Sequence, residues 1–189
     1  MTSLLLIRHA AAQIARDQAR TAWPLSPRGH EQAAALANTL RDESIDAIYS
    51  SPYARALETV TPLARARGLE VCVDDALGER VVSDGYVEDW DGVMARSWAD
   101  FDFRTEGGES NRECQVRIGR ALAALARQHR RQTVAVGTHG IVLALFLQSF
   151  SEFDYAAWRE MPEPALYRVE WLEDSGLFAL SGASEEGAD

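Results

Sequence analysis

Short apolar runs alternate along this chain with longer segments in which apolar residues recur every three or four positions. The first run, at residues 3–7, is apolar without interruption from Leu4 to Ile7, which is typical of a strand buried on both faces of a parallel sheet. Similar runs predict three further strands, at 45–50, 69–73 and 132–138. Because strands alternate with helical segments and no composition shift marks a linker, we expect a single α/β domain over residues 1–189.

Helix-start signals stand between these strands. Ser26 and Pro27 form an N-cap followed by proline at the first helical position, and Ser51 and Pro52 repeat the pattern. Ser110 begins an S-x-x-E capping box. The predicted helices are 26–42, 51–68, 110–131 and 140–150.

The remaining segments are less regular. Residues 74–109 lack sustained periodicity and are rich in Asp, Glu and Gly, so we interpret them as a long functional excursion on the substrate side. Residues 166–180 predict a hairpin with its turn at 174–176. The polar tail, 183–189, is expected to fray.

Composition excludes several classes of protein. No apolar run approaches the roughly 18 residues of a membrane span, so we expect a cytoplasmic protein without a membrane partner. The net charge of −10 argues against nucleic acid as a partner. Cys72 and Cys114 have no metal-ligand spacing and are expected to be free, buried thiols.

All 19 basic residues are arginine. The absence of lysine removes Schiff-base chemistry and the lysine of a P-loop. A bound anion must therefore be held by arginine, histidine or backbone N–H groups. Arginine presents a rigid fork of donors that suits phosphate and carboxylate oxygens.

Two of the four histidines occupy informative positions. His9 and His139 each follow a predicted buried strand, and ligands of open α/β sheets bind outside the carboxyl ends of strands. The two side chains can therefore meet in one crevice. His30 and His129 lie in polar helical stretches, where a solvent-facing or helix-end histidine is the expected interpretation.

Two arginines add positive charge to the same region. Arg8 precedes His9, and Arg55 falls in the first turn of the second predicted helix, where free N–H groups and the helix dipole attract anions. With His9 and His139, they predict a pocket for a compact dianion, most simply phosphate. Sulfate or carboxylate would satisfy the same argument less specifically.

These residues carry a family resemblance. The chain resembles the phosphoglycerate-mutase-like branch of the histidine phosphatase superfamily, whose RHG motif after the first strand reads RHA here. The similar segments occur in family order: LIRHA, LSPRGHEQA, YSSPYARALETV, LGER, GGES and VGTHGI. The resemblance implies a three-layer α/β/α fold of the phosphoglycerate-mutase type, with a mainly parallel central sheet.

The resemblance also implies a mechanism. His9 would attack the phosphorus and form a phosphohistidine, while Arg8, Arg55 and His139 hold the phosphoryl oxygens. Glu79 would protonate the leaving alkoxide and then activate water. No metal and no cofactor is implied. Other carboxylates of the acidic loop stay open as the proton donor: Glu88, Asp89 and Asp91.

The motif departs from the family pattern after its histidine. Residues 10–12 are alanines where glycine, an acidic residue and a hydroxyl residue are usual, and Ala15 replaces an asparagine that touches phosphate in many members. Gln13 or a backbone N–H is the candidate to compensate for that loss.

The expected function is therefore metal-independent hydrolysis of a small-molecule phosphate monoester through a phosphohistidine on His9. Two alternatives stay open: a phosphoglycerate or other phosphosugar mutase, and a non-catalytic regulatory protein that binds phosphate esters. A mutase must exclude water, and the excursion at 74–109 is modest cover for that purpose. The sequence leaves the substrate unidentified, and it is compatible with a homodimer without requiring one.

Overall fold

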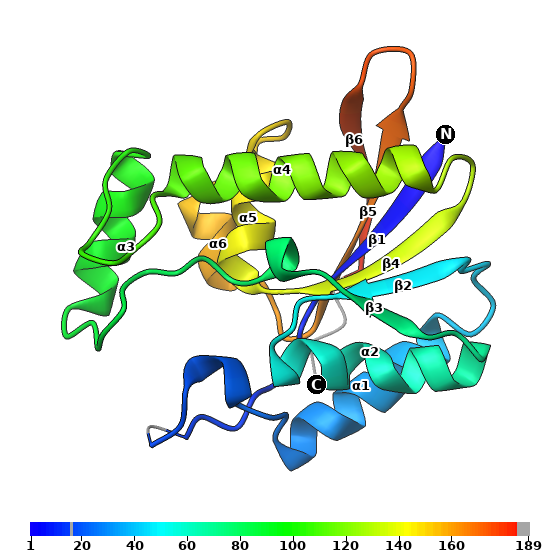
Figure 1. Ribbon diagram of the computed structural model, residues 1–189, viewed down its shortest axis with the longest axis horizontal. Coiled ribbons are helices and arrows are strands. Elements are labelled where there is room, and N and C mark those ends of the chain that lie inside the picture. Colours follow the sequence, from blue (N-terminus) through cyan, green and yellow to red (C-terminus); the bar gives the residue numbers. More distant parts are fainter. Residues whose placement is uncertain (16, 185–189) are drawn as a thin grey trace.

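The computed structural model describes residues 1–15 and 17–184 (Figure 1). The strands are β1 (Thr2–Arg8), β2 (Ala47–Ser50), β3 (Val71–Val73), β4 (Thr133–Thr138), β5 (Ala165–Leu172) and β6 (Leu177–Ser184). The helices are α1 (Pro27–Thr39), α2 (Ala54–Arg67), α3 (Trp90–Ala99), α4 (Asn111–Gln128), α5 (Gly140–Gln148) and α6 (Tyr155–Glu160). Two short 3-10 helices lie at Arg20–Ala22 and Asp75–Leu77.

All the named strands belong to one sheet, in the order β3-β2-β4-β1-β5-β6. Strands β1 to β4 pair in parallel, whereas β5 and β6 are antiparallel to their neighbours. Helices α1 and α2 cover one face of the sheet, and α4 and α5 cover the other (Figure 1). The expected three-layer α/β/α architecture with a mainly parallel sheet is thus confirmed.

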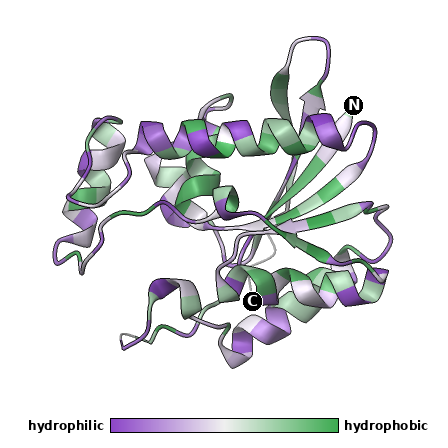
Figure 2. Ribbon diagram, viewed as in Figure 1, coloured by the Kyte–Doolittle hydropathy of each residue, from purple (hydrophilic) through white to green (hydrophobic). Residues whose placement is uncertain are grey.

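Strand β1 lies at the centre of both hydrophobic layers. Leu4 and Leu6 pack with α4 and α5, while Leu5 and Ile7 pack with α1 and α2. All four side chains are fully buried, which stabilises the fold by about 1.5–3 kcal/mol each relative to exposure. Figure 2 shows the hydrophobic residues concentrated on the central strands and on α5. The continuous apolar run therefore reflects burial on both faces.

The capping signals place two helix starts correctly and one incorrectly. The Ser26 hydroxyl accepts a hydrogen bond from an N–H of the first turn of α1 at 3.1 Å. Ser110 and Glu113 form both bonds of the capping box of α4, at 3.1 and 2.8 Å. The expectation for Ser51 is wrong, because α2 begins only at Ala54 and has no side-chain cap. The Ser51 hydroxyl is used elsewhere, as described below.

The excursion at 74–109 contains more regular structure than its pattern indicates. Helix α3 occupies its middle, and the Asp89 carboxylate caps α3 by accepting a hydrogen bond from the Gly92 N–H at 2.9 Å. This helix buries only Met94 and Ser97, so it leaves little hydrophobic periodicity in the sequence. A short 3-10 helix, Asp75–Leu77, begins the excursion.

The structure also bears on the cysteines, the C-terminal tail and the question of a membrane span. Both cysteines are free, but only Cys114 is buried, because Cys72 lies on the short edge strand β3 and is exposed. The tail expected to fray at 183–189 begins in ordered structure, since residues 183 and 184 belong to β6; residues 185–189 lie outside the described residues. In residues 1–15 and 17–184, no helix has the length and apolarity needed to cross a membrane.

Candidate active site

The sheet topology brings His9 and His139 together. They follow β1 and β4, which are parallel neighbours paired through Arg8 and Thr138 at their carboxyl ends. The two imidazole rings meet edge to face, with centroids 5.3 Å apart, and both are buried. Two histidines separated by 130 positions therefore form one pair at the carboxyl edge of the sheet.

The surroundings of His9 favour a neutral ring. Its Nδ1 lies 2.8 Å from the Ala10 carbonyl oxygen. Because a carbonyl only accepts, Nδ1 carries the hydrogen, and Nε2 of the neutral ring is left with a free lone pair. Burial, and then the charges of Arg55 and Arg8, lower the pKa of His9 to about 3, although the bond to Ala10 opposes this shift. His9 can therefore act as a nucleophile at neutral pH.

His139 is fixed from one side by a serine. Its Nε2 lies 2.7 Å from the Ser51 hydroxyl, which also accepts a hydrogen bond from the Tyr53 N–H at 3.2 Å. Burial, followed by the charges of Arg55, His9, and other arginines, holds the pKa of His139 well below its usual value. Its Nδ1 is buried and has no hydrogen-bond partner within the described part of the chain.

Arg8 is anchored by the segment that precedes β5. Its guanidinium donates to the Met161 carbonyl and to the Glu163 carboxylate. The guanidinium also packs over Gly140, where a Cβ atom would lie 3.1 Å from Arg8 Nε. That Nε atom is buried and has no hydrogen-bond partner among residues 1–15 and 17–184.

Arg55 approaches the pair from the first turn of α2. Its Nη1 donates to the Arg20 carbonyl at 2.6 Å, and its guanidinium lies 5.0 Å from the centre of the Tyr53 ring. Tyr53 in turn packs on His139, with ring centroids 4.7 Å apart. Burial lowers the pKa of Arg55, while the carboxylate of Glu79 opposes that effect. Arg55 thus supplies a buried positive charge close to both histidines.

Glu79 and Gln13 occupy different environments. The Glu79 carboxylate accepts hydrogen bonds from the N–H groups of Ile141 and Val142, at 3.1 and 2.9 Å, in the first turn of α5. Since His139 is the N-cap of α5, Glu79 is held beside the histidine pair. The Gln13 side chain is exposed, and its backbone N–H donates to the Pro24 carbonyl at 2.8 Å.

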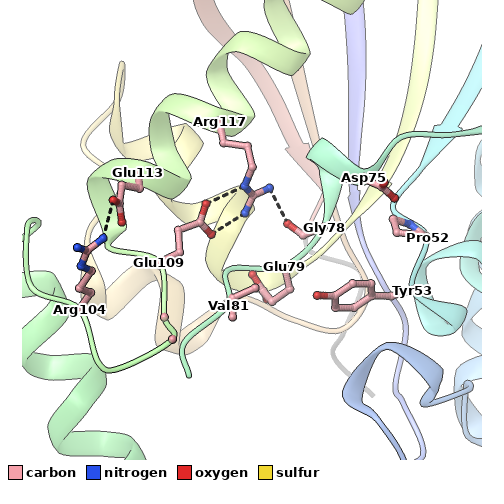
Figure 3. Close-up of a pocket in the computed structure, with 12 residues that line it drawn as sticks. Pro52, Tyr53, Asp75, Gly78, Glu79, Val81, Arg104, Glu109, Glu113 and Arg117 are labelled. Carbon is pink, nitrogen blue, oxygen red and sulfur yellow. Dashed lines mark hydrogen bonds and ion pairs between the residues drawn. The ribbon is translucent and has the colours of Figure 1, made fainter. Parts of the chain in front are cut away.

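A cavity of about 690 Å³ opens beside Glu79 and Tyr53 (Figure 3). Its wall contains more carboxylates than arginines. The lining residues are Pro52, Tyr53, Asp75, Gly78, Glu79, Val81, Arg104, Gly107, Gly108, Glu109, Glu113 and Arg117. The Tyr53 ring in this wall packs on His139, so the cavity adjoins the histidine pair and has room for the part of a ligand that extends beyond a phosphate.

The other two histidines make their contacts outside the pair. His30 is exposed, and His129 contacts Tyr49 and Gln132 through its ring nitrogens. Trp98 packs in an aromatic cluster with Phe101, Tyr155 and Trp158 and therefore fixes the excursion to the body of the protein. Within the described residues, no group of three or more His, Cys, Asp or Glu is arranged to hold a metal ion.

Sequence reasoning missed three residues that shape the site. Ser51 follows β2 at the same edge of the sheet as the two histidines, and this position could have marked it as a site residue. The Ser-Pro sequence led instead to its interpretation as a helix cap. Glu163 holds Arg8 from 155 positions away, and Arg117 reaches the cavity from the middle of α4. Neither of these two has a local sequence signal, because each depends on tertiary contacts.

The model of the histidine phosphatase superfamily (branch 1) matches residues 4–182 of this chain. The protein belongs to this superfamily. The histidine phosphatase chain is 33% identical to phosphoserine phosphatase 1 of Hydrogenobacter thermophilus, over 92% of this chain and 88% of that protein. It is 28% identical to a probable phosphoglycerate mutase of Salmonella choleraesuis, over 94% of this chain and 88% of that protein.

The fold of this histidine phosphatase is also shared with solved structures. The structure of YhfR from Bacillus stearothermophilus superimposes on this one with a TM-score of 0.81. The two sequences are 25% identical, and the match covers 100% of this chain and 98% of YhfR. The alanine after His9 fits without backbone strain: Ala10 is fully buried, and among the described non-glycine residues only Arg131 has a positive φ. The Ala15 carbonyl accepts a hydrogen bond from the Trp23 indole at 2.7 Å.

Proposed function

We propose that this protein hydrolyses small-molecule phosphate monoesters by transferring the phosphoryl group to Nε2 of His9. The observation that carries the proposal is the state of His9: a buried neutral imidazole with a free Nε2, surrounded by Arg8, Arg55 and His139. Membership of the superfamily and the 33% identical phosphoserine phosphatase support hydrolysis as the reaction.

The phosphoryl oxygens would be held by donors that lack a protein partner. Arg8 Nε and His139 Nδ1 are both buried and unpaired within the described residues, and buried polar groups rarely stay unpaired. If the Ser51 hydroxyl donates to His139 Nε2, then Nδ1 carries the hydrogen and can donate it to a phosphoryl oxygen. Arg55 adds charge, and Gln13 is proposed as a contact at the rim.

The reaction then runs in two steps. His9 Nε2 attacks phosphorus, the bond from phosphorus to the alcohol oxygen breaks, and the leaving alkoxide takes a proton from the carboxylic acid of Glu79. In the second step the Glu79 carboxylate takes a proton from water, and the resulting hydroxide attacks phosphorus. The P–N bond breaks, which restores His9 and releases inorganic phosphate. Arg8, Arg55 and His139 would stabilise the charge on phosphorus oxygens in both steps.

A trapping experiment tests the proposal. Wild type mixed with a ³²P-labelled phosphate ester, in excess chelator and quenched in alkali, is expected to carry acid-labile, base-stable label. His9→Ala should carry no label, and its turnover should fall by roughly a thousandfold or more. A wild type that binds the ester without labelling or turnover would instead indicate a non-catalytic binding protein and overturn the proposal.

A mutase is the second candidate, favoured by the likeness to the probable phosphoglycerate mutase. Incubation with a phosphoglycerate separates the two functions, because a mutase exchanges isomers without releasing phosphate. We expect phosphate release.

We also propose a cytoplasmic location, which the two free cysteines support.

A further inference from the structure

Arg117 of α4 clamps the chain directly before Glu79 (Figure 3). Its Nη1 donates to the carbonyls of Ala76 and Gly78, at 2.8 and 3.0 Å. Its Nε and Nη2 donate to the two carboxylate oxygens of Glu109, both at 2.8 Å. One guanidinium therefore joins the GGES segment to the backbone that carries the Glu79 side chain.

This clamp is largely shielded from water. The side chains of Arg117 and Glu109 are 27% and 17% exposed. Burial opposes the charge on Arg117, but the hydrogen bonds and charge of Glu109 outweigh it and raise the pKa of the guanidinium. A bidentate, shielded ion pair is more rigid than an exposed one, because both partners are fixed in orientation as well as distance.

Glu79 is also held by the first turn of α5. Its carboxylate accepts N–H bonds from Ile141, Val142 and the adjacent Arg80. Three of about four acceptor positions of a carboxylate are thus occupied, which leaves one direction for a substrate oxygen. The helix fixes the carboxylate, and the Arg117 clamp fixes the backbone behind it.

We propose that Arg117 and Glu109 are positioning residues that set Glu79 for proton transfer to the leaving alcohol. The inference rests on the proposed function, in which Glu79 is the proton donor. A general acid works only when its proton lies within hydrogen-bond reach of the accepting oxygen. Loosening the Ala76–Gly78 backbone should therefore slow the proton-dependent step selectively.

Two esters separate this role from a merely structural one. A simple alkyl phosphate releases an alkoxide, which needs a proton, whereas p-nitrophenyl phosphate releases a phenolate that leaves without one. The ratio kcat/KM includes only steps up to release of the alcohol, so later hydrolysis of the phosphohistidine does not enter. Arg117→Lys keeps the charge but cannot make all four hydrogen bonds.

For Arg117→Lys we expect kcat/KM to fall at least about tenfold with the alkyl ester and less than about threefold with p-nitrophenyl phosphate. Glu109→Gln should show the same selectivity, and the double variant should be no worse than the stronger single variant. Equal losses on both esters, in variants whose thermal unfolding shows that they are folded, would overturn the inference.

The same helix offers a matched control. Arg112 makes a bidentate pair with Asp102, at 2.6 and 3.1 Å, but this pair is exposed and belongs to neither the cavity wall nor the Glu79 backbone. Arg112→Lys should leave both esters unchanged. Glu79→Gln shows which of the two assignments fails. If Glu79→Gln lowers kcat/KM more for the alkyl ester than for p-nitrophenyl phosphate and Arg117→Lys does not, only the positioning role is wrong. If Glu79→Gln is itself unselective, the proton-donor assignment fails and this inference fails with it.

Discussion

Lowering the pH should destabilise this protein through His9. The unfolded chain binds a proton at this ring near pH 6.5, whereas the native ring binds one only near pH 3. Between these values the unfolded state holds more protons, so the free energy of unfolding decreases as the pH falls. For one such ring, moving from pH 7.5 to 4.5 costs about 2.5 kcal/mol. Burial is the main cause, and Arg55 and Arg8 add to it.

Urea unfolding of wild type and His9→Gln at pH 7.5 and 4.5 measures this effect. Other titrating groups contribute alike to both proteins, so the wild type should lose about 2.5 kcal/mol more than the variant. Equal losses in wild type and His9→Gln would refute the reasoning, because they would mean that the native ring accepts a proton as readily as the unfolded one.

Three further substitutions test a hydrogen bond of the site and the packing of two glycines. Ser51→Ala removes the hydroxyl that lies 2.7 Å from His139 Nε2. We expect the free energy of unfolding to fall by about 1–3 kcal/mol and kcat/KM to decrease. Wild-type values in both urea unfolding and kinetics would contradict this expectation. Gly29→Ala places a Cβ atom 2.1 Å from the Ala11 carbonyl oxygen and should cost about 1–3 kcal/mol in thermal unfolding. At Gly119 the added Cβ meets no other segment of residues 1–15 and 17–184 within 4 Å, so Gly119→Ala should stabilise α4 slightly. Equal effects of the two glycine variants would count against the packing argument.

The parts of the fold that the sequence predicts well are those with local signals. An apolar run that ends in Arg8 and His9 marks a buried strand and its carboxyl end, whatever the rest of the chain does. The same holds for His139 after β4 and for the capping box of α4. Because parallel strands share one carboxyl edge, the approach of the two histidines follows from topology alone.

The parts that escaped prediction either depend on partners far along the chain or bury too little to leave a pattern. Ser51 has a plausible local use before a proline, and only its contact 88 positions away shows that it serves His139. Helix α3 buries two residues and therefore lacks the periodicity by which helices are recognised. Glu163 and Arg117 act through single tertiary contacts, which no local pattern encodes.

The central position of β1 has a consequence for synthesis. β1 is made before the other named strands, yet its two neighbours, β4 and β5, are completed only at residues 138 and 172. At about 5–20 residues per second, the ribosome needs roughly 7–26 seconds to reach the end of β4 after β1. Throughout that interval the Leu4–Ile7 run has neither of its sheet partners. The nascent chain thus presents an unpaired apolar segment until β4, and then β5, has been made.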